Sequence, residues 1–341
     1  MPTIDLFTPR IPSADFHPVF AMLLQDEFAP ERAVLQEWAH DFQDRDGKFV
    51  QELQSTFESG LWELYLHASF RELGLKLDMS FSSPDFVVTG PRELIIEATV
   101  AAPPLGGKPA YNYDVSDIPT DFNKFNSDAT LRICNSFDSK IKRYRNYYSQ
   151  LPQSVDKPYV IAIGAFDRPL AHMAASRPIL AALYGLYHDE EETMLQRASA
   201  VISYNVAAAT KTDTKDIPVG LFCTDQYRDV SAVIYSALAT WGKIRALADN
   251  PSARTVYTTY HPNSKRLAAT VKTTLKKDYR EQLLDGLYIL HNPFAENPIK
   301  TGTLHHPRVA QCRVAEDGEL QIEAPEDFLL LRSLISVRTA G

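Results

Sequence analysis

The sequence predicts an α/β protein with a mixed central sheet flanked by helices, and three neighbouring stretches carry this prediction. Residues 83–99 hold two apolar runs separated by Gly90 and Pro91, a strong turn signal, and therefore predict a β-hairpin. Residues 158–165 form a continuous apolar run, which is typical of a central parallel strand. Residues 126–150 have helical periodicity and lie between the two, so together they predict a β-helix-β crossover.

Length and composition bound the domain organisation. The chain has 341 residues, a length that fits either one elaborated domain or two domains. Its content of 45% apolar residues suffices for a large core. We interpret residues 1–48 as an N-terminal helical arm and residues 49–200 as the core. Residues 201–341 then form a C-terminal mixed α/β extension, which either serves target recognition or oligomerisation or completes the same sheet.

Charge and cysteine content restrict the partners and the compartment. The N-terminus shows no signal-peptide pattern, and no apolar stretch of roughly 18 residues predicts a membrane span. Three widely spaced cysteines fit a reducing cytoplasm rather than a disulfide framework or a zinc site. The net charge of −8 argues against a constitutive nucleic-acid coat, so phosphate binding would need a local basic patch.

The longest helical pattern in the chain covers residues 48–74 and follows a shorter one at 30–41. Its second half is apolar almost all round, which indicates burial on most sides. Glu63 is the only acid between Leu61 and Phe70. A carboxylate there needs a partner: a hydrogen bond from a loop, an ion pair with an arginine, or a functional site. Residues 75–79 then predict a short strand leading into the hairpin.

Two more acids lie on the hairpin itself. Asp85 opens its first strand and Glu97 lies near the end of its second. An acid in an apolar run is costly to bury unless a cation meets it. Two carboxylates that converge beside a turn suit a divalent cation, since Mg²⁺ binds one or two carboxylates together with water and substrate phosphate. The alternative is that both are solvated residues at the edge of the sheet.

A cluster of basic and aromatic residues occupies the predicted crossover helix. Lys140, Lys142, Arg143 and Arg145 lie within six positions, and Tyr144 is interleaved with them. Such a run is often only a solvated helix face, but Lys140 borders the apolar stripe. The preceding loop, residues 100–123, is rich in Pro and Gly, and a loop of this length is usually functional or mobile.

The second half of the chain has a more β-like pattern. A helix at 169–187 and a solvated acidic turn at 189–192 precede it. Strands are predicted at 200–204, 218–223, 230–235, 255–260, 287–291, 309–314 and 320–323, and helices at 239–248, 272–284 and 325–335. His261 and the pair His305 and His306 are either metal ligands or solvated turn residues. No phosphate-binding loop, dinucleotide fingerprint or zinc-protease motif is present.

The first half resembles the PD-(D/E)XK, or restriction-endonuclease-like, nuclease superfamily over about residues 50–165. The matching motif is Pro84-Asp85, eleven intervening residues, then Glu97-Ala98-Thr99. The chain is also similar to a set of bacterial proteins with Trp-Glu-Leu-Tyr-Leu, Pro-Asp-Phe and Ile-Glu-Ala-Thr in this order, here residues 62–66, 84–86 and 96–99. Thr99 stands where the family has its lysine. In some members this lysine lies on the neighbouring helix, which nominates Lys140 or, second, Lys142.

This resemblance implies a restriction-endonuclease-like core and Mg²⁺-dependent (or Mn²⁺-dependent) hydrolysis of phosphodiester bonds in DNA, with a role in restriction or phage defence. Asp85, Glu97 and Glu63 would hold the metal, and Lys140 would assist catalysis. The nucleic-acid-binding residues would be Lys142, Arg143, Arg145 and Tyr144. A homodimer or a partner protein is expected as well. The alternatives are an inactive member that binds nucleic acid or a partner protein, and an RNA-directed nuclease.

Overall fold

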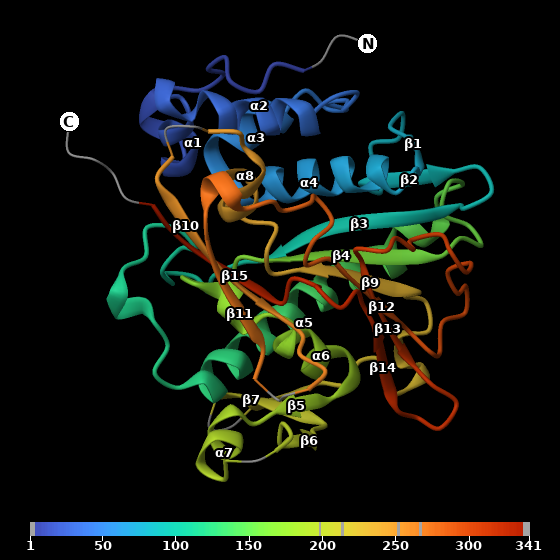
Figure 1. Cartoon of the computed structure of the whole chain (residues 1–341). Coiled ribbons are helices and arrows are strands. Elements are labelled where there is room, and N and C mark those ends of the chain that lie inside the picture. The colour runs from blue at the N-terminus through green and yellow to red at the C-terminus, as the bar shows by residue number, and fades with distance from the viewer. Residues whose placement is uncertain (1–3, 198, 213–214, 251–252, 266–267, 337–341) are drawn as a thin grey trace.

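The computed structural model describes residues 4–197, 199–212, 215–250, 253–265 and 268–336 (Figure 1). Within these residues an eight-stranded sheet forms the centre of the molecule, in the order β1-β2-β3-β4-β9-β12-β13-β14. Its strands are β1 (Lys76–Asp78), β2 (Phe86–Thr89), β3 (Leu94–Ala101), β4 (Tyr159–Ala165), β9 (Ala232–Ser236), β12 (Tyr288–His291), β13 (Ala310–Val314) and β14 (Leu320–Glu323). The prediction of an α/β protein with a mixed central sheet is confirmed.

The sheet is mixed because it contains both antiparallel and parallel pairs of strands. Strands β1, β2 and β3 are antiparallel, as the predicted hairpin requires, whereas β3, β4 and β9 run parallel. Strand β12 is antiparallel to β9 and parallel to β13, and β14 closes the far edge antiparallel to β13. All seven residues of β4 are buried, in agreement with a central strand covered on both faces.

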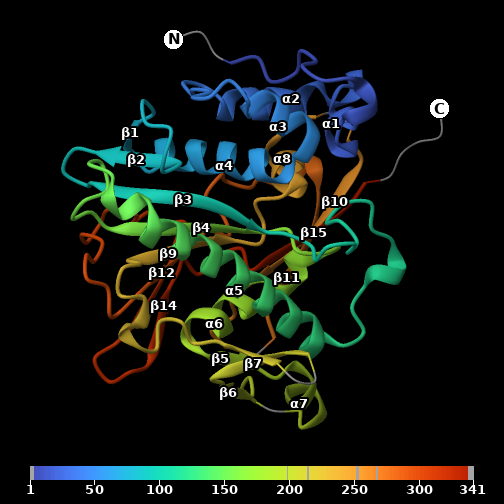
Figure 2. The same ribbon diagram turned by 180° about the vertical axis from the view of Figure 1, so that it is seen from behind.

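Helices cover both faces of the sheet (Figures 1 and 2). One face packs against α1 (Pro18–Leu23), α2 (Ala29–Trp38), α3 (Phe49–Thr56), α4 (Glu58–Glu72) and α8 (Trp241–Leu247). The other packs against α5 (Phe122–Asn146) and α6 (Arg177–Tyr184). The side chains of neighbouring residues in a strand point to opposite faces of the sheet. Ile96 therefore belongs to the core on the α4 face and Ile95 to the core on the α5 face.

The prediction of a single helix over residues 48–74 is wrong. The chain bends sharply at Phe57, and this bend divides the predicted helix into α3 and α4. Phe57 has φ 38° and ψ −56°, a conformation that no helix interior accommodates. At this corner the two helices approach closely, since a Cβ added at Gly60 would lie 2.8 Å from Leu53 Cδ1. The longest helix among the described residues is therefore α5, with 25 residues.

Several predictions in the second half are also wrong. Residues 272–284 and 325–335 contain the strands β11 (Thr270–Leu275) and β15 (Leu331–Ser336) instead of helices. Both pair antiparallel with β10 (Thr255–His261) in a separate three-stranded sheet. The predicted helix over 169–187 shrinks to α6, between the short helix η5 (Ala171–Ala174) and β5 (Leu186–His188). In place of the solvated turn, Asp189 caps α7 (Glu190–Leu195) by accepting a hydrogen bond from the Glu192 amide.

The residues after 200 contribute to both sheets. Strands β9, β12, β13 and β14 lie beside β4, so this part of the chain completes the sheet that the hairpin begins. Two two-stranded sheets lie outside it, one formed by β5 and β6 (Ser203–Asn205) and one by β7 (Ala208–Thr212) and β8 (Lys215–Pro218). The strand predicted over residues 218–223 is wrong, because β8 ends at Pro218 and residues 219–223 are not in a strand. Short 3-10 helices are η1 (Ser13–Asp15), η2 (Asp26–Phe28), η3 (Val115–Asp117), η4 (Tyr148–Gln150), η6 (Asp225–Tyr227) and η7 (Lys276–Asp278).

Two further predictions concern the whole chain. In the part that the structure describes, no helix combines the length and the apolar character needed to cross a bilayer. Cys134, Cys223 and Cys312 are all free thiols, as their odd number and wide spacing suggested.

Candidate functional site

Asp85 and Glu97 meet at the end of the hairpin next to α5. Phe86 pairs with Ile96 across the two strands, and this register places Asp85 beside Glu97. The Asp85 amide donates a hydrogen bond to Glu97 Oε2 at 3.3 Å. Asp85 Oδ2 in turn accepts a hydrogen bond of 2.7 Å from the backbone amide of Ala98, the residue after Glu97. The pleat that sends Ile95 towards α5 sends Glu97 the same way, two residues further along the strand.

Glu97 is the buried centre of the site, with 1% of its surface exposed. Lys140 Nζ lies 2.8 Å from Glu97 Oε1, and the Tyr148 hydroxyl donates to the same oxygen at 3.0 Å. Lys142 points elsewhere and pairs with Asp138 at 2.6 Å on the exposed face of α5. Of the two lysines nominated from the sequence, the structure therefore brings only Lys140 to the carboxylates.

Arg45 binds the third acid, Glu63, and joins it to the start of the hairpin. Its Nη2 lies 3.3 Å from Glu63 Oε1 and 3.9 Å from Asp85 Oδ1. Its Nη1 donates to three backbone carbonyls, those of Phe81, Pro84 and Asp85, at 3.0, 3.2 and 2.8 Å. The arginine thus holds residues 81–85 against α4 and supplies the partner that a carboxylate in an apolar helix requires.

The electrostatics of the site reflect three acids in a confined space. Burial raises the pKa of Glu63 to about 8, and the charge on Asp85 adds to this effect while Arg45 opposes it. Burial likewise raises the pKa of Asp85 to about 6, with a further increase from Glu97 and a decrease from Lys140. Raised carboxyl pKa values mean that the negative charges are under-compensated in the protein alone, and an added cation would relieve them.

The donor set fits a divalent cation bound by two carboxylates. Asp85 and Glu97 are adjacent, and Mg²⁺ commonly takes one or two carboxylates and completes its shell with water and phosphate. Across the described residues, no group of three or more His, Cys, Asp or Glu side chains is arranged to hold a metal ion. Glu63 itself pairs with Arg45, so its part as a third metal ligand stays a prediction.

The predicted nucleic-acid-binding residues on α5 have different environments. Tyr144 is only 9% exposed and stacks on Tyr159 with 4.0 Å between ring centroids, and its contact with nucleic acid stays a prediction. Arg145 makes a two-pronged ion pair with Asp229 at 2.6 and 2.9 Å. The Arg143 guanidinium lies over the Tyr148 ring, 5.1 Å from its centroid. The basic run on α5 is thus largely matched by acids and aromatic rings of the protein.

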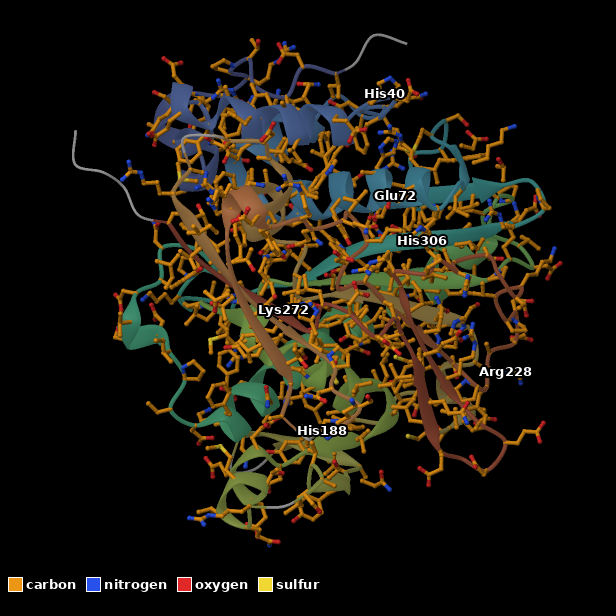
Figure 3. All side chains as sticks on the ribbon, in the orientation of Figure 1. His40, Glu72, His188, Arg228, Lys272 and His306 are labelled. Carbon is orange, nitrogen blue, oxygen red and sulfur yellow. The ribbon has the colours of Figure 1, made fainter. Side chains whose placement is uncertain are left out.

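The histidines singled out from the sequence serve local structure. His261 Nδ1 lies 2.9 Å from the Asp327 carbonyl oxygen, and His306 Nδ1 accepts the Arg308 amide at 3.1 Å. Figure 3 shows His306 in the region of Glu72, at the C-terminal end of α4. Neither these residues nor His305 belongs to a metal-binding group within the described part of the chain.

Arg45 and Tyr148 are the two site residues that the sequence did not indicate. Arg45 lies in the Asp44-Arg45-Asp46-Gly47 turn, and its carboxylate partners are 18 and 40 residues away along the chain. Tyr148 continues the apolar stripe of the predicted helix and therefore looks like a core residue. Only its hydroxyl distinguishes it from Phe in such a stripe.

Comparison with known proteins identifies no relative, because no protein-family model, no curated protein and no solved structure matches this chain. The function has to be inferred from the geometry of the site.

Proposed function

We propose that the protein is a metal-dependent nuclease of the restriction-endonuclease-like type that hydrolyses phosphodiester bonds in DNA. The observation that carries this proposal is the contact of Lys140 with Glu97, next to Asp85. The motif lacks its usual lysine at Thr99, and an amine from the crossover helix lies at the carboxylates instead. The order α4, β1, β2, β3, α5, β4 is the order expected of such a core and also supports the proposal.

Each side chain has a distinct task in this proposal. Asp85 and Glu97 would hold Mg²⁺ or Mn²⁺, which lowers the pKa of a bound water and neutralises charge on the phosphate. Lys140 orients the attacking water and stabilises negative charge that develops on the phosphate oxygens. The water loses a proton as its oxygen forms a bond to phosphorus, the ester P–O bond breaks, and the departing ester oxygen takes up a proton to leave as an alcohol. Arg45 keeps the residues around Asp85 in place through its bonds to their carbonyls.

The test compares two lysines of the same helix. Plasmid DNA, linear DNA and RNA are incubated with the protein and Mg²⁺ or Mn²⁺, with EDTA as the metal-free control. We expect cleavage of DNA that EDTA abolishes. Lys140→Met and Asp85→Asn should reduce the rate by on the order of a hundredfold or more. Lys124→Met should cleave at the wild-type rate, because Lys124 is exposed on the same helix and pairs with Asp128 at 2.9 Å. Equal rates for the two lysine variants would refute the assignment of Lys140.

A second candidate function is a catalytically inactive protein that binds nucleic acid or a partner protein. The position of Arg45 favours it, because a permanent cation already lies beside Glu63 and Asp85. This candidate predicts no cleavage of any substrate with either metal, together with retention of DNA or RNA in a gel-shift assay. A cytoplasmic location, a role in restriction or phage defence, and assembly as a homodimer or with a partner protein belong to the main proposal.

A further inference from the structure

A cavity of about 350 Å³ lies at the carboxyl end of β4, apart from the carboxylates described above. It is lined by Ala165, the last residue of β4, by Phe166, and by residues of α1, the first turn of α4, the start of α8 and β15. Part of the loop between β3 and α5, residues 110–113, also lines it. Figures 1 and 2 both show this loop on the side of the molecule where β10 and β15 lie. The volume and the position are typical of a small-molecule site, since ligands of α/β proteins bind at the carboxyl ends of parallel strands.

The walls are mainly flat aromatic and apolar side chains. The aromatic residues are Phe57, Tyr111, Tyr113, Phe166 and Trp241. Two of them are held by further ring contacts: Tyr111 meets His17 edge-on at 4.3 Å, and Trp241 meets Phe28 at 5.8 Å between ring centroids. Such a lining favours a planar ligand, because flat rings gain both burial and stacking energy against aromatic faces.

Two residues that line the cavity have strained backbone conformations. Phe57 has φ 38° and Leu170 has φ 58°, and both residues line it. Residues other than glycine adopt positive φ only at a cost, and such residues concentrate at ligand-binding and active sites. The bend at Phe57 is also what separates α3 from α4 and places the start of α4 at the cavity wall.

Two polar side chains of the lining have hydrogen-bonding groups without a partner among the described residues. Arg332 is 3% exposed; it bonds Glu281 and the Leu238 carbonyl, but its Nε finds no hydrogen-bond partner among the described residues. His172 makes no side-chain hydrogen bond to any described residue, and burial followed by the charge of Arg332 lowers its pKa to about 4. Its imidazole is therefore neutral at pH 7 and offers one donor and one acceptor. The other charged residues of the lining are matched, Glu58 by His17 at 3.3 Å and Arg168 by Asp128 at 3.5 Å.

We propose that this cavity binds a planar heteroaromatic ring that carries one anionic group, the chemistry of a mononucleotide. The aromatic walls would stack on the ring, and His172 would pair with a donor and acceptor on its edge. Arg332 would receive the anionic group, since a buried guanidinium nitrogen without a partner is costly until an acceptor reaches it. The same chemistry is offered by a free nucleoside monophosphate and by an unpaired nucleotide of a nucleic-acid strand. The inference does not depend on the nuclease proposal.

The experiment measures binding in EDTA, so that cleavage plays no part. Nucleoside monophosphates, the corresponding nucleosides, and short single-stranded oligonucleotides are titrated against the full chain, with calorimetry and tryptophan fluorescence as readouts. We expect saturable binding of the monophosphate or of the oligonucleotide, and the stronger of the two identifies the source. Nucleosides should bind at least tenfold more weakly, on the order of one lost charge-assisted hydrogen bond.

Three variants locate the binding. Ala110→Trp fills the cavity from the loop, and Leu105→Trp is the matched control on the same loop, since Leu105 is fully exposed and outside the lining. His172→Phe keeps a flat ring but removes its donor and acceptor. We expect Ala110→Trp and His172→Phe to weaken binding at least tenfold, while Leu105→Trp binds as the wild type does and all three keep its circular-dichroism spectrum. No binding of any titrant, or equal binding by Ala110→Trp and Leu105→Trp, would overturn the proposal.

Discussion

Glu97 illustrates, at the scale of a single residue, how a buried charge organises its surroundings. Its carboxylate accepts hydrogen bonds from the Lys140 ammonium, the Tyr148 hydroxyl and the Asp85 amide. A buried carboxylate is tolerated only when it is paired and hydrogen-bonded, and these donors provide both. The pattern of an acid inside an apolar strand predicted that a cation would meet it. The family resemblance nominated Lys140 before Lys142 as this cation, and Lys140 also borders the apolar stripe of its helix. Tyr148 and Arg45 could not be predicted, because nothing in the local sequence marks a side chain whose partner is distant along the chain.

The hydroxyl of Tyr148 should contribute to stability through Glu97. Tyr148→Phe leaves the buried ring in place and removes one hydrogen bond to a charged acceptor, which should lower the free energy of unfolding by about 1.5–3 kcal/mol. Urea denaturation measures this change. The control is Tyr147→Phe, because Tyr147 is 52% exposed and should change stability by no more than about 0.5 kcal/mol. Equal changes in the free energy of unfolding for the two variants would show that the hydrogen bond to Glu97 does not contribute to stability.

Glu63 should make stability depend on pH. Its pKa is about 8 in the folded protein against 4.5 ordinarily, so the folded state binds the proton more tightly than the unfolded state. Its contribution to stability is therefore greatest below pH 4.5 and falls as the pH rises towards 8. Glu63→Gln removes this titration and keeps an oxygen acceptor for Arg45. The variant should match the wild type near pH 4 and become progressively more stable than it up to about pH 8, as measured by thermal unfolding across the pH series. A constant difference would contradict the prediction.

At the scale of elements, the parts that could be predicted are those specified by nearby residues. The hairpin follows from its Gly90-Pro91 turn, and the crossover follows from helical periodicity beside a continuous apolar strand. The strands β11 and β15 could not be predicted, because they exist only through pairing with β10, and β15 begins 70 residues after β10 ends (331 against 261). The bend at Phe57 could not be predicted either, because helical periodicity continues through it in the sequence.

The N-terminus of α5 should depend on its capping residue. The Asp121 side chain accepts a hydrogen bond from the Lys124 amide at 2.7 Å and so satisfies one free donor of the first turn. Asp121→Ala should lower the free energy of unfolding by about 0.5–2 kcal/mol, whereas Asp121→Asn should preserve most of it. Denaturant titration of the three proteins measures the difference. If the alanine and asparagine variants are equally stable, the cap does not support the helix that carries Lys140.

At the scale of the whole molecule, a buried ion pair joins two segments that are far apart along the chain. Glu31 of α2 is completely buried and receives hydrogen bonds from Arg245 of α8 and from Asn250. The residues predicted as an N-terminal arm therefore pack against an element near residue 245, on the same face of the sheet as α4. Neither partner looks unusual in the sequence, since the two are more than 200 residues apart.

Breaking the pair of Glu31 and Arg245 should destabilise the entire fold. Glu31→Ala leaves the Arg245 guanidinium buried without its partner, which should cost about 3–5 kcal/mol. The control on the same helix is Glu37→Ala, because Glu37 is 63% exposed and its pair with Arg71 should be worth no more than about 1 kcal/mol. Thermal and urea unfolding compare the two variants. A small effect of Glu31→Ala would mean that water enters and solvates Arg245.

The place of β9 between β4 and β12 has a consequence for how this protein can be divided. A fragment that stopped near residue 200 would keep the hairpin, α5 and β4 but would expose one complete edge of β4. That edge belongs to an uncharged seven-residue strand, Tyr-Val-Ile-Ala-Ile-Gly-Ala, with the features that promote intermolecular strand addition. Such a fragment should self-associate, so assays of the acidic site require the chain to continue at least through β9.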